Sequence, residues 1–347
     1  MHIGFRMKSG AAALIVASLC TISHAQQQPP QAEIHNKQLK VTIDLPDAQN
    51  GFYKGVRFEG GGSAIADLEF AGNHIYRAWF SSSDASVPDF TYKDDKIVTG
   101  TNTAMTGPAE EFQAAIGYTD APVGGTFLKI GVGALRKTDT NPYRFTSHFD
   151  LVDGGKWTVK KSSNSVSYKQ VFGAPGSDYA YVYTKTIRLV GDTSQMVIEH
   201  HLKNTGRLAL TSQLYDHNFL TIDGIPTGKA YSVTAPYDLK PTQQPNAKFF
   251  SVDGKTASYI ADLTGQDRAS VGLQGFGADA KDYDFRITNH TAGVEVRIQG
   301  DHPLTNATLW SIRSVMAVEP FIKVQADHGN TFDWSYTYTY SSVSKAP

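Results

Sequence analysis

Alternation of apolar and polar residues recurs along the chain from Leu39 almost to the C-terminus. Residues 181–190 read YVYTKTIRLV and residues 196–204 read MVIEHHLKN, with the turn-forming sequence GDTSQ between the two hydrophobic runs. A period of two places neighbouring side chains on opposite faces of a strand, and a short polar turn between two such runs predicts an antiparallel hairpin. The same pattern predicts further strands at residues 269–274, 293–299, 309–322 and 333–340.

The helical period is nearly absent from this chain. Residues 108–116 are compatible with one short helix, and the sequence GPAEEF at 107–112 predicts a loop or a single helical turn that carries paired acids. Glycine and proline are scattered singly between the strands, so we expect no linker inside residues 39–342. The pattern therefore predicts one large all-β domain over residues 39–342, built of two packed, curved sheets with any site on a concave face.

Composition supports this fold class and narrows the function. The 347 residues include 31 Gly, 17 Tyr and 18 Phe, which favour turns and strands. The formal net charge is −1, so the chain lacks the basic field that would attract a nucleic acid. The single cysteine, Cys20, lies near the N-terminus, which leaves the rest of the chain without a disulfide, a thiolate metal site or a cysteine nucleophile.

The N-terminal segment predicts export. Arg6 and Lys8 precede an apolar run over residues 11–22 that is too short to span a bilayer, and SHA at residues 23–25 supplies the small residues of a cleavage site. We expect a signal peptide at residues 1–25 and a flexible spacer at residues 26–38, which begins QQQPP. The mature protein is then periplasmic or secreted, with no membrane insertion.

Motifs for several other chemistries are missing. The sequence contains no G-x-S-x-G elbow and no H-E-x-x-H metal motif. His200 and His201 are neighbours on a predicted strand, so their rings point to opposite faces and do not share an ion. Asp282 and Asp284 are more typical of a solvated strand edge than of a calcium loop. We therefore expect no metal and no cofactor.

Residues 214–220 (LYDHNFL) carry a first chemical signal. On a strand, Tyr215, His217 and Phe219 share one face. Aromatic rings stack on the apolar face of a pyranose, and an imidazole transfers protons near neutral pH. A sugar site is one interpretation of this face, and a core histidine bonded to a carbonyl is the other.

Residues 310–322 (WSIRSVMAVEPFI) carry a second signal. On one strand, Arg313, Val315, Ala317 and Glu319 share a face, and Pro320 marks a strand end or edge. A lone carboxylate in apolar surroundings acquires a raised pKa, as a general base near pH 7 requires. The alternative is an edge glutamate paired with Arg313 or facing water.

Two basic residues stand in otherwise apolar surroundings. Arg57 lies in GVRFE at residues 55–59, and Lys129 lies in FLKIG at residues 127–131. Either side chain could donate hydrogen bonds to sugar hydroxyls, or could pair with a carboxylate inside the fold.

Taken together, these segments resemble the aldose 1-epimerase (galactose mutarotase-like) superfamily, in particular exported bacterial members. The matching sequences are NGFYKGVRFEG (50–60), GPAEEF (107–112), GTFLKIGVGALRK (125–137), HHLKNTG (200–206), YDHNF (215–219), WSIRSVMAVEP (310–320) and WSYTY (334–338). The resemblance implies a β-supersandwich in which His217 is the general acid and Glu319 the general base of sugar ring opening. Asp216 and Asn218 flank His217 where the family has Asn before its histidine, and Glu110 and Glu111 stand where the family has a second histidine.

We therefore expect a carbohydrate-active isomerase that acts on a sugar or oligosaccharide. The candidate catalytic residues are His217 and Glu319, and the candidate sugar-binding residues are Arg57, Glu111, Lys129, Tyr215, Asn218 and Phe219. A polysaccharide lyase, in which Arg57 and Lys129 would neutralise a uronate, and a non-catalytic carbohydrate-binding protein remain alternatives. The identity of the sugar and the oligomeric state stay open.

Overall fold

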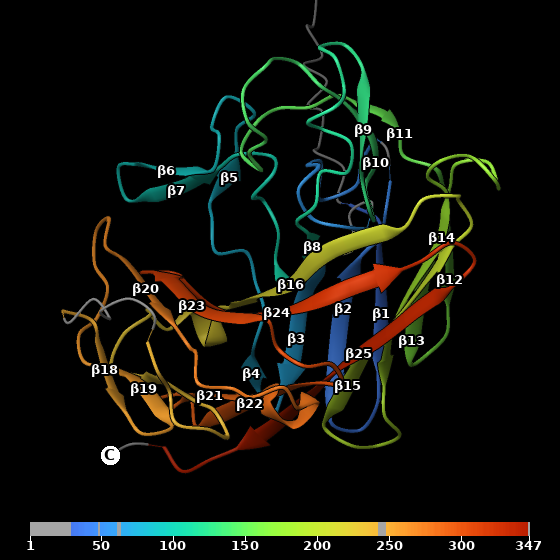
Figure 1. The fold of residues 1–347 in the computed structure, drawn as a ribbon. Coiled ribbons are helices and arrows are strands. Elements are labelled where there is room, and N and C mark those ends of the chain that lie inside the picture. Colours follow the sequence, from blue (N-terminus) through green and yellow to red (C-terminus); the bar gives the residue numbers. More distant parts are fainter. Residues whose placement is uncertain (1–28, 48, 61–63, 242–247, 346–347) are drawn as a thin grey trace, which may run out of the picture.

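The chain folds almost entirely into β-strands, as the alternating pattern predicts (Figure 1). A computed structural model describes residues 29–347 apart from residues 48, 61–63, 242–247 and 346–347. The predicted signal peptide at residues 1–25 lies outside the described residues. Within them, the helical elements are two single turns of 3₁₀ helix, η1 (Ile222–Gly224) and η2 (Ala280–Asp282).

The larger of the two main sheets has ten strands, all antiparallel to their neighbours. Its order is β12 (Lys156–Lys161), β13 (Ser165–Phe172), β14 (Tyr181–Leu189), β15 (Gln195–Asn204), β25 (Thr331–Ser342), β22 (Val294–Gly300), β21 (Asp284–Asn289), β17 (Tyr231–Thr234), β19 (Thr256–Tyr259) and β18 (Phe250–Asp253). The predicted hairpin at residues 181–204 is the β14–β15 pair, in which Tyr181 lies opposite Asn204.

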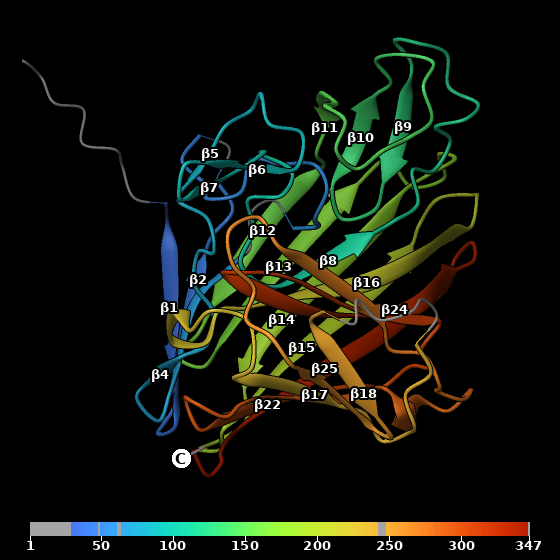
Figure 2. The same ribbon diagram turned by 90° about the vertical axis from the view of Figure 1, so that its left-hand side faces the viewer.

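The second main sheet has five antiparallel strands. Its order is β20 (Arg268–Gly272), β23 (Asn306–Ile312), β24 (Val315–Ala326), β16 (Leu210–Leu220) and β8 (Gly107–Phe112). Strands β8, β16 and β24 lie across β14, β15 and β25 of the ten-stranded sheet (Figures 1 and 2). A large hydrophobic core, which includes Leu214, Val318 and the inward rings of β25 from Trp334 to Tyr340, fills the space between the two sheets.

Three smaller sheets complete the fold. They are β1 (Gln31–His35), β2 (Leu39–Asp44), β3 (Ile65–Phe70) and β4 (Asn73–His74); then β9 (Thr126–Lys129), β10 (Gly133–Arg136) and β11 (Leu151–Asp153); and β5 (Ser82–Ser83), β7 (Lys96–Thr99) and β6 (Phe90–Lys93). The sheets β5–β7–β6 and β11–β10–β9 both stand at the upper end of the molecule in Figures 1 and 2. They rise beyond the five-stranded sheet, where their loops can border a site on it.

Strand β1 lies within the predicted flexible spacer at residues 26–38 and corrects that prediction for residues 31–35. Residues 26–28 lie outside the described residues. Residues 31–35 pair along their whole length with β2, and Ile34 is fully buried in the main core. A single apolar residue between polar neighbours gives little sequence signal. Burial of Ile34 against distant strands is what orders this segment.

The segment GPAEEF is a strand, so the prediction of a loop or a helical turn at residues 107–112 is wrong. All six residues of β8 are buried and pair with β16. The strand begins at Gly107, whose φ is +67° and where an added Cβ would lie only 2.8 Å from the Cβ of Ile65. Two adjacent glutamates fit in a buried strand because each meets a cation from a distant element, as described below.

The predicted single strand at residues 309–322 is in fact a hairpin. Strand β23 ends at Ile312 and β24 begins at Val315, so Arg313 lies in the turn and does not share a face with Glu319. Pro320 does not end a strand, since β24 continues to Ala326 between β23 and β16. The ladder between β24 and β16 is interrupted at Pro320, which has no N–H to donate.

Candidate active site

The site begins at a gap in the ladder between β16 and β24. Tyr215 pairs with Phe321 and Asn218 pairs with Val318, and this register puts His217 directly opposite Glu319. Facing residues on neighbouring antiparallel strands have side chains on the same face. His217 Nε2 lies 3.0 Å from Glu319 Oε1, with 6% and 15% of the two side chains exposed. The two residues that the sequence singles out for proton transfer therefore meet.

Both groups have shifted pKa values. Burial raises the pKa of Glu319 to about 7, although the positive charge of Arg57 opposes this rise. Burial and the charge of Arg57 both lower the pKa of His217 well below its usual value. Because the two groups are in contact, they titrate as a pair rather than separately.

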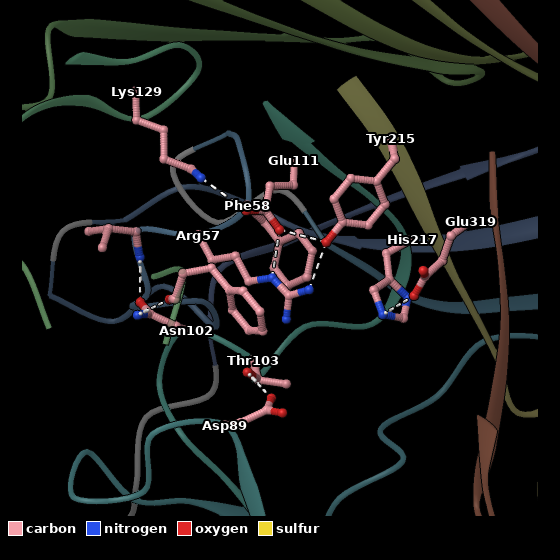
Figure 3. A network of polar contacts seen from close by, with 12 residues as sticks. Arg57, Phe58, Asp89, Asn102, Thr103, Glu111, Lys129, Tyr215, His217 and Glu319 are labelled. Carbon is pink, nitrogen blue, oxygen red and sulfur yellow. Dashed lines mark hydrogen bonds and ion pairs between the residues drawn. The ribbon is translucent and has the colours of Figure 1, made fainter. Parts of the chain in front are cut away.

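Ring contacts, rather than a third polar group, orient the imidazole. The ring of His217 stacks on Phe219 with a centroid distance of 3.8 Å and an interplanar angle of 14°. Phe58 and Trp310 meet the same ring edge-on at 6.1 and 5.6 Å. Among the described residues, Nδ1 of His217 has no hydrogen-bond partner. The ring is therefore held by packing, with Nε2 directed at Glu319 (Figure 3).

The pair opens onto a small cavity of about 160 Å³. Phenylalanine and tryptophan make up four of its nine lining residues, and the other five carry polar side chains, a mixture that offers a sugar both ring faces and hydrogen-bonding groups. The lining residues are Arg57, Asp89, Phe90, Thr103, Phe145, His217, Phe219, Trp310 and Glu319.

Arg57 is the one predicted sugar-binding cation that borders this cavity. Its Nε donates to Glu111 Oε2 at 2.7 Å and its Nη2 donates to the Tyr215 hydroxyl at 2.7 Å (Figure 3). The guanidinium lies between two rings, with Cζ 3.9 Å from the ring centroid of Phe145 and 4.6 Å from that of Phe58. These contacts fix a buried positive charge beside the proton-transfer pair.

Glu111, Lys129 and Tyr215 hold Arg57 from behind instead of lining the cavity with it. Glu111 accepts from the Tyr215 hydroxyl at 2.6 Å and from Lys129 Nζ at 3.0 Å. Burial alone would raise the pKa of Glu111, but Lys129 and Arg57 outweigh burial and keep that pKa below its usual value. None of the three borders this cavity, and their polar groups are bonded to one another, so their part in binding a sugar stays a prediction.

Asn218 lies on the opposite face of β16 from His217. Its Nδ2 donates to the carbonyl of Val318 at 3.0 Å, and its Oδ1 accepts from the Tyr338 hydroxyl at 2.8 Å. The side chain is fully buried between the two main sheets and does not reach the cavity. Phe219, two residues from His217 on the same face, does border it.

A second set of ionisable groups is buried behind the site. Lys185 Nζ on β14 donates to Glu59 Oε1 at 2.6 Å and to Glu110 Oε2, and His200 Nε2 lies 2.7 Å from Glu110 Oε1. Burial raises the pKa of Glu59 to about 8, whereas Lys185 and His200 outweigh burial at Glu110 and lower its pKa. Near neutral pH, Lys185 is therefore balanced by one ionised carboxylate, that of Glu110.

His200 and His201 point to opposite faces, as the strand period predicts. The side chain of His200 is fully buried, whereas 53% of the His201 side chain is exposed next to Asp333. His200 stacks on Trp334 at 4.6 Å inside the core. The two rings cannot reach one ion.

One group of possible metal ligands occurs among the described residues, formed by Asp67, Glu69 and His74. His74 Nδ1 lies 2.7 Å from Asp67 Oδ2, and Lys40 Nζ lies 3.5 Å from Glu69 Oε1. These acids already have cationic or imidazole partners, and none of the three residues borders the cavity.

No helix in the described ranges is long and apolar enough to cross a membrane.

Four residues that line the cavity carried no clear sequence signal, and a fifth, Trp310, was not recognised as a site residue. Asp89, Thr103 and Phe145 lie in loops, and Phe90 begins the short strand β6. Trp310 lies in a segment that the sequence did single out, and pairing of β23 with β24 places it opposite Ala317, on the face of Glu319. Recognition of that hairpin would have identified Trp310, but the loop residues depend on tertiary structure.

Comparison with known proteins identifies the fold. No protein-family model and no curated protein sequence matches the chain. Solved structures do match, and those with a TM-score of 0.51 include the following three. A galactose mutarotase related enzyme from Lactobacillus acidophilus has 10% identity and a TM-score of 0.51, over 91% of this chain and 98% of its own. A galactose mutarotase-like protein from Clostridium acetobutylicum has 10% identity and a TM-score of 0.51, over 90% and 95% of the two chains.

The Slr1438 protein from Synechocystis, with 11% identity and a TM-score of 0.51, covers 92% of this chain and 99% of its own. Identities this low show a shared architecture and nothing of a shared ligand. The sheets described above and these matches together show that the chain has the galactose mutarotase-like fold.

Proposed function

We propose that this protein is an aldose 1-epimerase-like isomerase, which interconverts the two anomers of a sugar by opening and reclosing its ring. The observation that supports the proposal most is the contact between His217 and Glu319, two groups of shifted pKa that face one aromatic-lined cavity. Perturbed proton-transfer groups in a cavity are a frequent mark of an active site.

In the proposed reaction, the pair accepts one proton from the sugar and donates another to it. The Glu319 carboxylate takes the proton of the anomeric hydroxyl while the imidazolium of His217 gives a proton to the ring oxygen O5. The C1–O5 bond breaks and C1 becomes a carbonyl. After rotation about C1–C2, the C5 hydroxyl attacks the other face of C1, His217 takes back its proton and Glu319 returns the other. The protein ends in its starting protonation state.

The electrostatics favour this reaction over a lyase reaction. A lyase needs a cation to neutralise the carboxylate of a uronic acid. Lys129 is fully buried, and Lys129 and Arg57 share the single negative charge of Glu111. Asp89 adds a carboxylate to the cavity. An anionic sugar would therefore meet little uncompensated positive charge.

Substitution of the pair tests the proposal. We expect His217→Asn and Glu319→Gln each to lower the rate of anomer exchange by roughly 10²–10⁴-fold, the usual contribution of a general acid or base. The rate is measured by polarimetry or by NMR exchange on a panel of freshly dissolved aldoses. His201→Asn is the matched control, since His201 is exposed on the neighbouring sheet and should leave the rate unchanged.

Both variants must melt like the wild type for the comparison to hold. Folded variants that keep the wild-type rate would refute the roles of His217 and Glu319. A wild type that binds aldoses but accelerates none of them would refute the epimerase proposal and support a binding protein. Ultraviolet absorbance of an unsaturated product would instead support the lyase.

A further inference from the structure

Asp89 is the one cavity residue with an ionisable carboxylate that the proposed ring opening does not use. It lies between β5 and β6, outside the two main sheets, and is followed by Phe90. Phe90 packs edge-on against Trp79 and Trp310 at 5.9 Å from each. Because Trp310 belongs to the five-stranded sheet, these contacts hold the small sheet β5–β7–β6 next to the site and fix the position of Asp89.

One oxygen of the Asp89 carboxylate is hydrogen-bonded within the protein, and the other is not. Its Oδ1 accepts a hydrogen bond of 2.8 Å from the Thr103 hydroxyl. Oδ2 has no hydrogen-bond or ion-pair partner among the described residues, and the side chain borders the cavity. One acceptor is therefore positioned by Thr103 while the other is open to a ligand.

Arg57 provides a complementary donor across the same space. Glu111 and Tyr215 bond Nε and Nη2, which leaves Nη1 without a partner in the described part of the chain. Figure 3 shows this free end of the guanidinium pointing toward the side of the cavity where Thr103 and Asp89 lie, apart from the His217–Glu319 contact. A free acceptor and a free donor thus face a space beside the proton-transfer pair.

We propose that Asp89 determines specificity by accepting hydrogen bonds, through Oδ2, from one or two adjacent ring hydroxyls other than the anomeric one. The inference rests on the proposed function for the placement of the sugar. A hydroxyl donates and accepts at the same time, so adjacent hydroxyls can donate to Asp89 and accept from Arg57. The ligand class is accordingly a sugar with a free pair of neighbouring hydroxyls at this position.

Asp89→Asn tests this role with little change to the fold. The amide keeps an oxygen to accept from Thr103 but replaces the free acceptor by an NH₂ donor. A hydrogen bond to a charged group contributes enough to predict a rise in KM of roughly 10–100-fold, with kcat changed by only a few-fold. Asp84→Asn on the same small sheet is the control, because Asp84 bonds Ser86 and Lys93 and does not line the cavity.

Monodeoxy analogues of the best aldose separate recognition from a structural role. For an analogue that lacks a contacted hydroxyl, the KM difference between wild type and Asp89→Asn should shrink or vanish, whereas for the other analogues the full difference should remain. An equal penalty for every analogue, or an unchanged KM for the parent sugar, would overturn the inference. Asp84→Asn should match the wild type throughout, and if it raises KM as much as Asp89→Asn does, the effect belongs to the small sheet and the inference fails.

Calorimetric titration with the same sugars keeps this test independent of catalysis. If the wild type turns over no aldose but binds one, and Asp89→Asn weakens that binding with the same dependence on one hydroxyl, the proposed function fails and the role of Asp89 holds. If the wild type neither binds nor converts any neutral aldose of the panel, the role of Asp89 fails as well.

Discussion

His217 and Glu319 hold one proton between them over a defined range of pH. Above the Glu319 pKa of about 7, the pair consists of a carboxylate and a neutral imidazole, and holds no proton to give. Below that pKa one proton enters the pair. The two pKa shifts favour this proton on Glu319, and its transfer to His217 Nε2, 3.0 Å away, gives the imidazolium–carboxylate form that ring opening requires. The low pKa of His217 delays entry of a second proton.

The pair therefore predicts a specific pH profile. We expect kcat/KM for anomer exchange to be high below pH 7 and to fall about tenfold per pH unit above it, because the singly protonated pair disappears as Glu319 ionises. NMR exchange between pH 5 and pH 9, corrected for the uncatalysed rate at each pH, measures this profile. A kcat/KM that rises through pH 7 and stays high would show that Glu319 acts as a base without a proton from His217.

At the scale of elements, strands β8 and β16 have different chemistry on their two faces. Glu111, Tyr215 and His217 face the site, whereas Glu110 and Asp216 face the ten-stranded sheet. Burial raises the pKa of Asp216 to about 8, so this acid is neutral at pH 7 and bonds the Tyr338 hydroxyl. The floor of the site thus rests on a buried layer whose charges balance near neutral pH.

Lys185 is the cation on which this layer depends. We expect Lys185→Met to lower the free energy of unfolding by about 3–5 kcal/mol, since Glu110 would keep a buried charge without its partner. Urea unfolding at pH 7 measures the loss. Arg207→Met is the matched control, because the Arg207–Asp178 pair is mostly exposed and such pairs contribute at most about 1 kcal/mol. A Lys185→Met variant as stable as the wild type would show that the charges of this layer do not matter for folding.

The sequence could predict the features that depend on alternation of side chains along a strand. It could not predict those that depend on contacts with distant segments of the chain. The β14–β15 hairpin, the opposite faces of His200 and His201 and the shared face of His217 and Phe219 all follow from alternation along one strand. Strand β8 could not be predicted as a buried strand, because two adjacent glutamates are typical of a solvent-exposed segment. Their partners Lys185, His200, Arg57 and Lys129 come from four other segments of the chain.

The loop residues of the site were beyond reach for the same reason. No periodic pattern marks Asp89 in the sequence. Only its hydrogen bond with Thr103 and its position in the cavity wall identify it as a site residue. Arg57 and Lys129 stand out in the sequence, but only the folded structure shows that both bond Glu111 and that the arginine borders the cavity while the lysine does not.

At the scale of the whole molecule, elements from different sheets share one main hydrophobic core. One hydrophobic cluster includes Ile34 from β1, Leu214 from the five-stranded sheet and Tyr340 from the ten-stranded sheet. We therefore expect a single calorimetric transition whose van't Hoff and calorimetric enthalpies agree. Two well-separated transitions would show that the small sheets or the ten-stranded sheet unfold independently.

The cavity walls come partly from strands and partly from loops, and this difference decides which parts of the site can change in evolution. His217, Glu319 and Trp310 come from paired strands of one sheet, whereas Asp89, Thr103 and Phe145 come from loops beyond it. A loop tolerates insertion and exchange far better than a strand paired on both sides. Descendants of this chain could accept new sugars by replacing a loop while inheriting the ring-opening pair intact, and a laboratory graft of the segment around Asp89 or Phe145 would follow the same route.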